Sequence, residues 1–128
     1  PEAEVLLGRG IRSAEELRQA ARDLGRFGSR SVLVKGGHRE EADSSDLLYM
    51  CREDRFVTLT AERVGSRNTH GTGCTLSSAI AARLAGGDPL EEAVSRAKEY
   101  ISRAIRAGAR YTLGRGHGPV HHFFNYWV

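Results

Sequence analysis

Residues 68–84 read NTHGTGCTLSSAIAARL, a glycine-bearing loop that runs directly into a segment of small and apolar residues. That composition is typical of a helix pressed against a sheet. Glycines at 71 and 73 allow consecutive backbone amides to turn inward, and the following helix adds unpaired N–H groups and the positive end of its dipole. The stretch therefore predicts an α/β fold with a phosphate-binding loop. The alternative is a glycine-rich helix entry without a ligand.

An amphipathic helix and a buried strand are predicted ahead of this loop. Ser13 and Glu16 have the spacing of a capping box. The apolar residues that follow at helical spacing are Leu17, Ala20, Ala21 and Leu24. Residues 31–35 form a short apolar run closed by two glycines, which predicts a strand that ends in a tight turn. Residues 39–46 are charged and polar, so we expect an exposed connection there.

A strand pair and a long helix are predicted on either side of the loop. Residues 47–51 and 56–60 are separated by a charged segment, which indicates a hairpin. Asp88, Pro89 and Glu91 predict a helix start with Asp88 as N-cap. We expect this helix to end near Gly108 and to bury Leu90, Ala93, Val94, Ala97, Ile101, Ala104 and Ile105. These strands are too few to form a complete covered sheet, so half of a larger sheet is expected.

The composition favours a cytoplasmic globular protein that binds neither nucleic acid nor membrane. The chain has 128 residues, of which 40% are apolar. The arginines behind the net charge of +3 are scattered among acidic residues rather than gathered into a stripe. No apolar run approaches the roughly 20 residues needed to cross a bilayer, and the N-terminus lacks a secretory pattern. The first residues suggest a segment cut from a longer chain.

The cysteines and histidines are the residues to consider as reactive groups or metal ligands. Cys51 and Cys74 form no CxxC pair, and reduced thiols are expected. Cys74 lies at the predicted helix start and is the candidate reactive thiol, against the alternative of a small buried apolar residue. The candidate zinc ligands His117, His121 and His122 lack the spacing of a four-ligand set, so no zinc site is expected. The aromatic segment 120–128 is interpreted as a tail that docks on the core.

The loop at 68–75 resembles the glycine loop of hydroxymethylpyrimidine/phosphomethylpyrimidine kinases of the ribokinase-like superfamily. Three other stretches are similar to family segments in the same order, namely residues 34–38, 97–101 and 114–121. Residues 1–8 resemble the segment that follows a Thr-Pro-Asn in these enzymes. The resemblance implies a ribokinase-like three-layer α/β/α sandwich. Residues 1–128 would then be the C-terminal half of one kinase domain, with the N-terminal half missing.

The resemblance also implies an activity and a set of functional residues. The activity is ATP-dependent phosphorylation of 4-amino-5-hydroxymethyl-2-methylpyrimidine or its monophosphate in thiamine biosynthesis, by a homodimer that uses ATP and Mg²⁺. Cys74 would be the base and would contact the substrate. The expected anion-hole amides are those of Gly71, Thr72 and Gly73. The expected ATP-binding residues are Lys35, Gly37, Thr69 and Lys98. Glu2 would help to organise Mg²⁺ and phosphate.

Several alternatives stay open at this point. Pyridoxal kinase activity is compatible with the same cysteine loop. A non-catalytic ligand-binding domain of a fused regulatory protein is the alternative from a different class. Lys35 could be a solvated strand-end lysine, and Lys98 could extend its ammonium group from an apolar stripe to solvent. The isolated segment is expected to be inactive and prone to aggregation, because half a sheet leaves an open edge.

Overall fold

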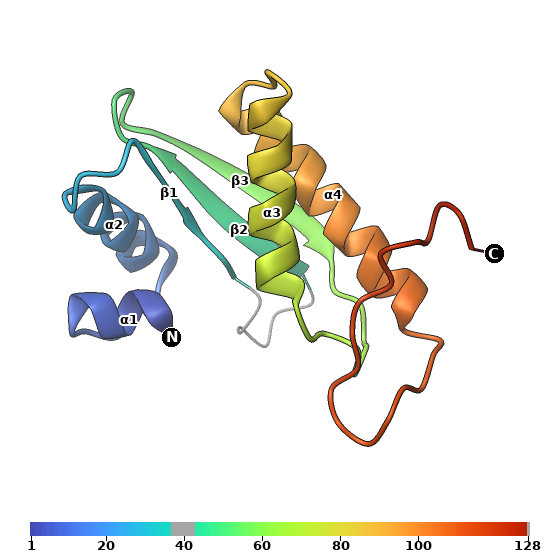
Figure 1. The fold of residues 1–128 in the computed structure, drawn as a ribbon. Helices are drawn as coiled ribbons and strands as arrows, with labels where there is room; N and C mark the ends of the chain where they lie inside the picture. Colours follow the sequence, from blue (N-terminus) through green and yellow to red (C-terminus); the bar gives the residue numbers. More distant parts are fainter. Residues whose placement is uncertain (37–42, 128) are drawn as a thin grey trace. The chain divides into compact units, whose positions relative to one another are not determined.

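The computed structural model describes residues 1–36 and 43–127 (Figure 1). The chain divides into two compact units, Pro1–Thr60 and Ala61–Val128, which we call the first and the second unit and describe separately. Helices and a three-stranded sheet are both present, which confirms the α/β class. The elements in chain order are α1 Glu2–Leu7, α2 Ala14–Gly25, β1 Ser31–Val34, β2 Asp43–Met50, β3 Arg55–Glu62, α3 Thr72–Ala85 and α4 Leu90–Gly108.

Helix α2 of the first unit begins at the predicted capping box. The Ser13 hydroxyl accepts a hydrogen bond from the Glu16 N–H at 3.1 Å, and the Glu16 carboxylate accepts from the Ser13 N–H at 3.2 Å. The same carboxylate accepts from the Arg12 N–H at 2.6 Å. The bonds from Arg12 and Ser13 lower the pKa of Glu16, because they favour its charged form. The capping box therefore engages the Glu16 amide of the first turn and places a carboxylate at the start of α2.

The sheet has the strand order β1-β2-β3, and β1 pairs antiparallel with β2 from Ser31↔Met50 to Val34↔Leu47. An exposed connection was predicted for residues 39–46, but strand β2 already begins at Asp43, so the prediction is wrong for residues 43–46. Residues 39–42 lie outside the described residues. Asp46 is buried, and its carboxylate accepts a hydrogen bond from the Gly36 N–H at 2.9 Å. This long-range bond lets a polar residue occupy the strand, which the local sequence could not indicate.

The core of the first unit lies between α2 and the strands. Its buried residues are Ala21, Leu47 and Tyr49, with Leu17, Val32, Val34, Cys51 and Phe56 packed against them. The rings of Tyr49 and Phe56 stack with centroids 4.7 Å apart. The Tyr49 hydroxyl donates to Asp54 at 3.0 Å, and Arg22 binds the same carboxylate through two nitrogens at 2.9 and 3.2 Å. The bond from Arg22, followed by that from Tyr49, lowers the pKa of Asp54.

Helices α3 and α4 pack side by side in the second unit (Figure 1). The buried residues of α4 are Ala93, Val94, Ala97, Lys98, Ile101, Ala104 and Gly108. This confirms most of the predicted apolar stripe, although Leu90 and Ile105 are only half-buried. The predicted N-cap is wrong, because α4 begins after Pro89 without a side-chain cap. The Asp88 carboxylate instead lies 3.8 Å from Arg83 and 3.9 Å from Arg96, and these ion pairs hold it away from the helix start.

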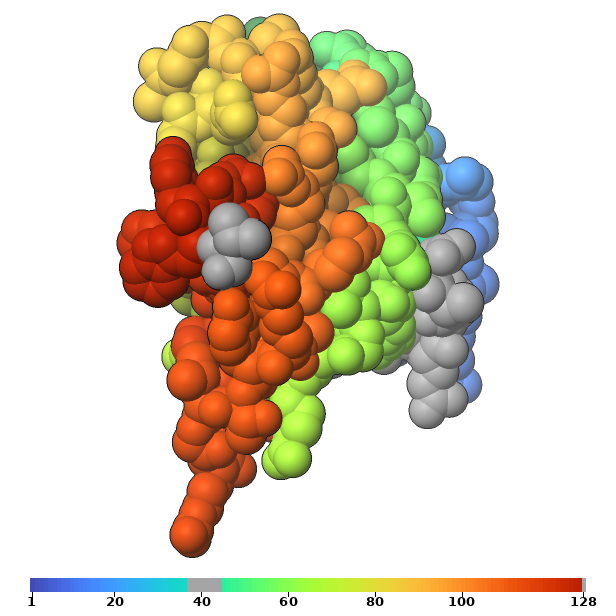
Figure 2. All heavy atoms as spheres, turned by 90° about the vertical axis from the view of Figure 1, so that its right-hand side faces the viewer, coloured from blue at the N-terminus to red at the C-terminus, as the bar shows by residue number. Residues whose placement is uncertain are grey.

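The C-terminal segment is fixed to the rest of the second unit. His70 and Pro119 form an isolated parallel bridge, and Val120 is buried. Arg103 of α4 donates to the Asn125 side chain at 2.7 Å and lies over the ring of Phe124. Figure 2 shows the C-terminal residues, in red, against the orange α4. The predicted docking tail is therefore present, while the exposed aromatic side chains within it are Phe123, Tyr126 and Trp127.

Candidate active site

The glycine loop leads into α3 through a left-handed residue. Gly71 is the N-cap, with φ of 82°, a conformation that a side chain disfavours. The Thr75 N–H donates to the Gly71 carbonyl at 2.9 Å and closes the first turn. Helix α3 thus begins at Thr72, and its first turn contains Gly73 and Cys74, which was expected at the helix start.

Two peptide N–H groups at the start of α3 are open. The Thr72 N–H donates to the Thr69 carbonyl at 3.3 Å, and the Thr72 hydroxyl donates to the same carbonyl at 2.7 Å. The Gly73 and Cys74 N–H groups are too close to the helix start for an intrahelical acceptor, and they have no hydrogen-bond partner among the described residues. The first turn contains no acidic residue. The expected donors were the amides of Gly71, Thr72 and Gly73, so the sequence missed the open amide of Cys74 and wrongly included the bonded amide of Thr72.

The thiol of Cys74 is exposed beside these amides. That exposure removes the interpretation of Cys74 as a small buried apolar residue. Cys51 differs, because it is half-buried and packs against the core of the first unit. A solvent-accessible sulfur at a helix N-terminus lies where an incoming anion and a reacting hydroxyl can both approach it.

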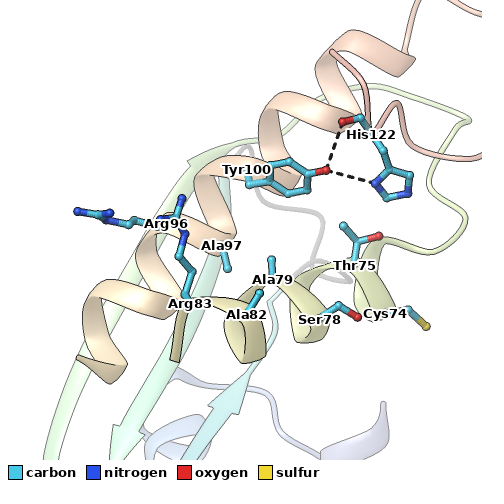
Figure 3. Close-up of a pocket in the computed structure, with 10 residues that line it drawn as sticks. All are labelled: Cys74, Thr75, Ser78, Ala79, Ala82, Arg83, Arg96, Ala97, Tyr100 and His122. Carbon is cyan, nitrogen blue, oxygen red and sulfur yellow. Dashed lines mark hydrogen bonds between the residues drawn. The ribbon is translucent and has the colours of Figure 1, made fainter. Parts of the chain in front are cut away.

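A pocket of about 650 Å³ extends from Cys74 along the groove between α3 and α4 (Figure 3). Its apolar lining includes Ala79, Ala82 and Ala97. Arg83 and Arg96 lie at the end away from Cys74 (Figure 3). Tyr100 and His122 lie at the other side, where the Tyr100 hydroxyl donates to the His122 carbonyl at 3.3 Å. A mostly apolar lining with a few charged and polar groups is typical of a small-molecule site.

Sequence reasoning did not identify this pocket. Its walls come from α3, α4 and the C-terminal segment, and no local pattern connects these three parts of the chain. It also missed Asn68, which is only 5% exposed and donates hydrogen bonds to the carbonyls of Gly108 and Tyr111. A single asparagine ahead of a glycine loop gives no signal that distinguishes such a buried anchor from an ordinary turn residue.

The other expected site residues are divided between the two units. Thr69 is exposed and lies in the loop ahead of α3. Lys98 is only 6% exposed on α4, so its ammonium group does not extend to solvent as the alternative interpretation required. Lys35 follows β1 as an exposed residue, and Glu2 is exposed at the start of α1, so both belong to the first unit. Gly37 lies outside the described residues.

The described residues provide no ready-made metal site. No group of three or more His, Cys, Asp or Glu side chains within residues 1–36 and 43–127 could hold a metal ion. Glu2, the expected contributor to Mg²⁺ binding, is a single exposed carboxylate at the start of α1. Mg²⁺ in phosphotransfer sites takes many of its ligands from substrate phosphates and water, so one carboxylate is compatible with an indirect role. No helix in the described part of the chain is long and apolar enough to cross a membrane.

Comparison with solved structures places the chain in a fold class. The pyridoxal kinase of Staphylococcus aureus in complex with ADP superposes with a TM-score of 0.88 and 32% sequence identity, over 99% of this chain and 46% of that one. The chain therefore has the ribokinase-like α/β fold of small-molecule kinases. A sequence profile described as phosphomethylpyrimidine kinase matches residues 1–121, and the chain belongs to this family.

Two curated relatives agree with the family. The chain is 54% identical over 122 residues to the thiamine biosynthesis bifunctional protein ThiED of Geobacter sulfurreducens, and 50% identical over 127 residues to the hydroxymethylpyrimidine/phosphomethylpyrimidine kinase of Rhizobium meliloti. The matches cover 95% and 98% of this chain. The chain spans 24% of the length of the first relative and 47% of the second.

Proposed function

We propose that the protein carrying these residues is an ATP-dependent kinase that phosphorylates hydroxymethylpyrimidine, its monophosphate, or both, in thiamine biosynthesis. Residues 1–128 form the C-terminal part of its single kinase domain in this proposal. The observation that carries it is the pair of open amides of Gly73 and Cys74 beside an exposed thiol, in a chain of the phosphomethylpyrimidine kinase family. Such a turn suits the terminal phosphate of a nucleotide.

In this proposal, the backbone amides and the Cys74 side chain at the start of α3 carry out the phosphoryl transfer. The amides of Gly73 and Cys74, with the expected amide of Gly71, donate to the oxygens of the transferring phosphoryl group. The Thr72 amide, which was also expected there, donates to the Thr69 carbonyl instead.

When the substrate is the alcohol, its oxygen forms a bond to the γ-phosphorus, the bond from that phosphorus to the leaving oxygen of ADP breaks, and the hydroxyl proton passes to the Cys74 thiolate, which becomes the thiol. ATP would supply the phosphoryl group, and Mg²⁺, with Glu2 as the proposed contributor to its binding, would neutralise charge on the phosphates. A monophosphate substrate attacks through an oxygen that is already ionised, so a base contributes little there.

The remaining expected residues keep their proposed roles. Lys35, Gly37, Thr69 and Lys98 are the proposed nucleotide-binding positions, and Glu2 is the proposed contributor to Mg²⁺ organisation. Lys98 is supported by its burial on α4, next in sequence to the pocket-lining Ala97. A homodimer in the cytoplasm is proposed for the complete protein.

Pyridoxal phosphorylation is the second candidate function. The structural similarity to the S. aureus pyridoxal kinase, with a TM-score of 0.88, favours it on the level of fold. The identity of 50% to a hydroxymethylpyrimidine/phosphomethylpyrimidine kinase favours the pyrimidine instead. Both activities use the same phosphate-binding turn, so substrate trials distinguish them.

A coupled ADP-release assay on the full-length gene product that contains these residues tests the proposal. Hydroxymethylpyrimidine, its monophosphate and pyridoxal are offered in separate reactions with ATP and Mg²⁺. We expect ADP release with one or both pyrimidines at a higher kcat/KM than with pyridoxal. Release with pyridoxal alone would support the second candidate. No release with any of the three would favour a non-catalytic ligand-binding domain.

A further inference from the structure

The side chain of Asn68 connects the glycine loop to the far end of α4. Its amide nitrogen donates to the Gly108 carbonyl and to the Tyr111 carbonyl, both at 2.7 Å. Because both partners are carbonyl groups, they can only accept, and the orientation of the amide is fixed. The side chain is 95% buried, so an unmatched group at this position would carry the full cost of desolvation.

The amide oxygen of Asn68 faces Gly118 in the C-terminal segment. A Cβ atom built on Gly118 would overlap this oxygen and would lie 2.8 Å from the Asn68 Cγ. Gly118 is not among the glycines with a positive φ, so an alanine could adopt its backbone conformation. Glycine is therefore required at 118 for space, and the space is taken by the side chain of Asn68.

The C-terminal segment also holds the loop through its backbone. The His70 N–H donates to the Gly118 carbonyl at 3.0 Å, one residue ahead of the left-handed Gly71. The His121 N–H donates to the Ala104 carbonyl of α4 at 3.1 Å. The loop is thus held both through Asn68 and through His70, and each of these connections leads to the C-terminal end of α4.

We propose that Asn68 is a positioning residue for phosphoryl transfer, which fixes the entry of the loop so that the Gly73 and Cys74 amides point at one place. Asn68 touches no reacting atom in this proposal, and its effect passes through the backbone of residues 69–74. The inference rests on the proposed kinase function for its catalytic consequence. The connection between loop and C-terminal segment rests on the contacts alone.

The test uses Gly118→Ala in the full-length gene product, with Gly116→Ala as the matched control. Gly116 lies in the same segment, is not among the glycines with a positive φ, and has open space where a Cβ would lie. We expect Gly118→Ala to displace the Asn68 amide and to lower kcat about 10- to 100-fold, since a small misplacement of positioned groups has effects of this size. KM for ATP should change much less, because the misdirected amides act mainly in the transition state.

A double variant separates positioning from loss of fold. Without the Asn68 side chain the Cβ at 118 has room, so adding Gly118→Ala to Asn68→Ala should lower kcat by less than about twofold further. Hydrogen exchange by mass spectrometry on the same samples should show faster exchange in residues 68–76 of Gly118→Ala and no change in Gly116→Ala. All rates are divided by the folded fraction from thermal unfolding.

Each other outcome overturns a stated part of the inference. Faster exchange at 68–76 with unchanged kcat would overturn the catalytic role. Equal losses for Gly118→Ala in both backgrounds would overturn the contact with Asn68 as the cause. An inactive wild-type protein would overturn the proposed function and with it the catalytic consequence. Unchanged exchange in Gly118→Ala would then overturn the connection as well.

Discussion

Helices α2 and α3 begin in opposite ways. At α2 the Ser13 hydroxyl accepts from the Glu16 N–H at 3.1 Å, and the Glu16 carboxylate lies at the helix start and accepts from the Ser13 N–H at 3.2 Å. At α3 the N-cap is Gly71, which has no side chain to offer, and the amides of Gly73 and Cys74 lie open. A helix start closed by its own carboxylate contributes stability, whereas an open one can bind an anion. The start of α3, and not that of α2, is therefore the proposed phosphate-binding site.

Removal of the thiol at the open helix start should have the largest effect. Cys74→Ala in the full-length gene product should lower kcat for the alcohol substrate about 100-fold or more, as expected for a lost general base. The rate with the monophosphate should fall much less, because its attacking oxygen is already ionised. Cys51→Ala is the control from the first unit, and ADP release is measured with both substrates. Equal losses with both substrates would remove the assignment of Cys74 as base.

An acidic side chain placed in the first turn of α3 should give this helix start a carboxylate of its own, as the start of α2 already has. Thr72→Asp puts a carboxylate beside the open amides, where it competes with a bound phosphate. Interactions of this type reach about 2 kcal/mol, so KM for ATP should rise by up to roughly 30-fold. Thr72→Asn has the same shape without the charge and should change KM far less. If both variants changed KM equally, charge at the helix start would not be the determinant.

Removal of the N-cap side chain of α2 should lower the stability of the protein and leave its activity unchanged. Ser13→Ala removes the acceptor for the Glu16 N–H and should lower the free energy of unfolding by about 1 kcal/mol, within the range measured for N-caps. Ser13→Asp keeps an acceptor and should restore most of the loss. Thermal unfolding measures both variants, and turnover per folded molecule should be unchanged. A fall in turnover with Ser13→Ala would show that the two starts do not divide stability from function.

The smallest effect concerns the pH dependence of the first unit. Because Arg22 and Tyr49 lower the pKa of Asp54, this group stabilises the folded state above the ordinary range near pH 4. The stabilisation is lost as the pH falls through the lowered folded-state pKa. Asp54→Asn, which tolerates the φ of 44° at this position, should therefore lower Tm at pH 7 more than at pH 3. A Tm difference that is the same at both values would exclude this linkage.

The parts of the fold that could be predicted are those with local signals. The capping box of α2, the short strand β1 and most of the stripe of α4 follow from spacing along a few turns. Asp88 was misassigned because its ion pairs with Arg83 and Arg96 compete with capping. Distant contacts of this kind are absent from any local pattern.

The candidate site was predictable to a similar degree. The glycine loop and Cys74 are contiguous, so sequence alone identified them, and the exposure of the thiol agrees with a functional role. The exact start of α3 depends on the left-handed conformation of Gly71, and the role of Asn68 depends on carbonyls 40 and 43 residues away. The residues next to the loop predict neither the start of α3 nor the contacts of Asn68.

A crystal structure of the full-length gene product with Mg²⁺ and a non-hydrolysable ATP analogue tests the central claim most directly. The account predicts γ-phosphate oxygens within about 2.7–3.1 Å of the Gly73 and Cys74 nitrogens, with the Cys74 sulfur facing the same phosphate. A terminal phosphate bound elsewhere, with these two amides still open to solvent, would contradict it.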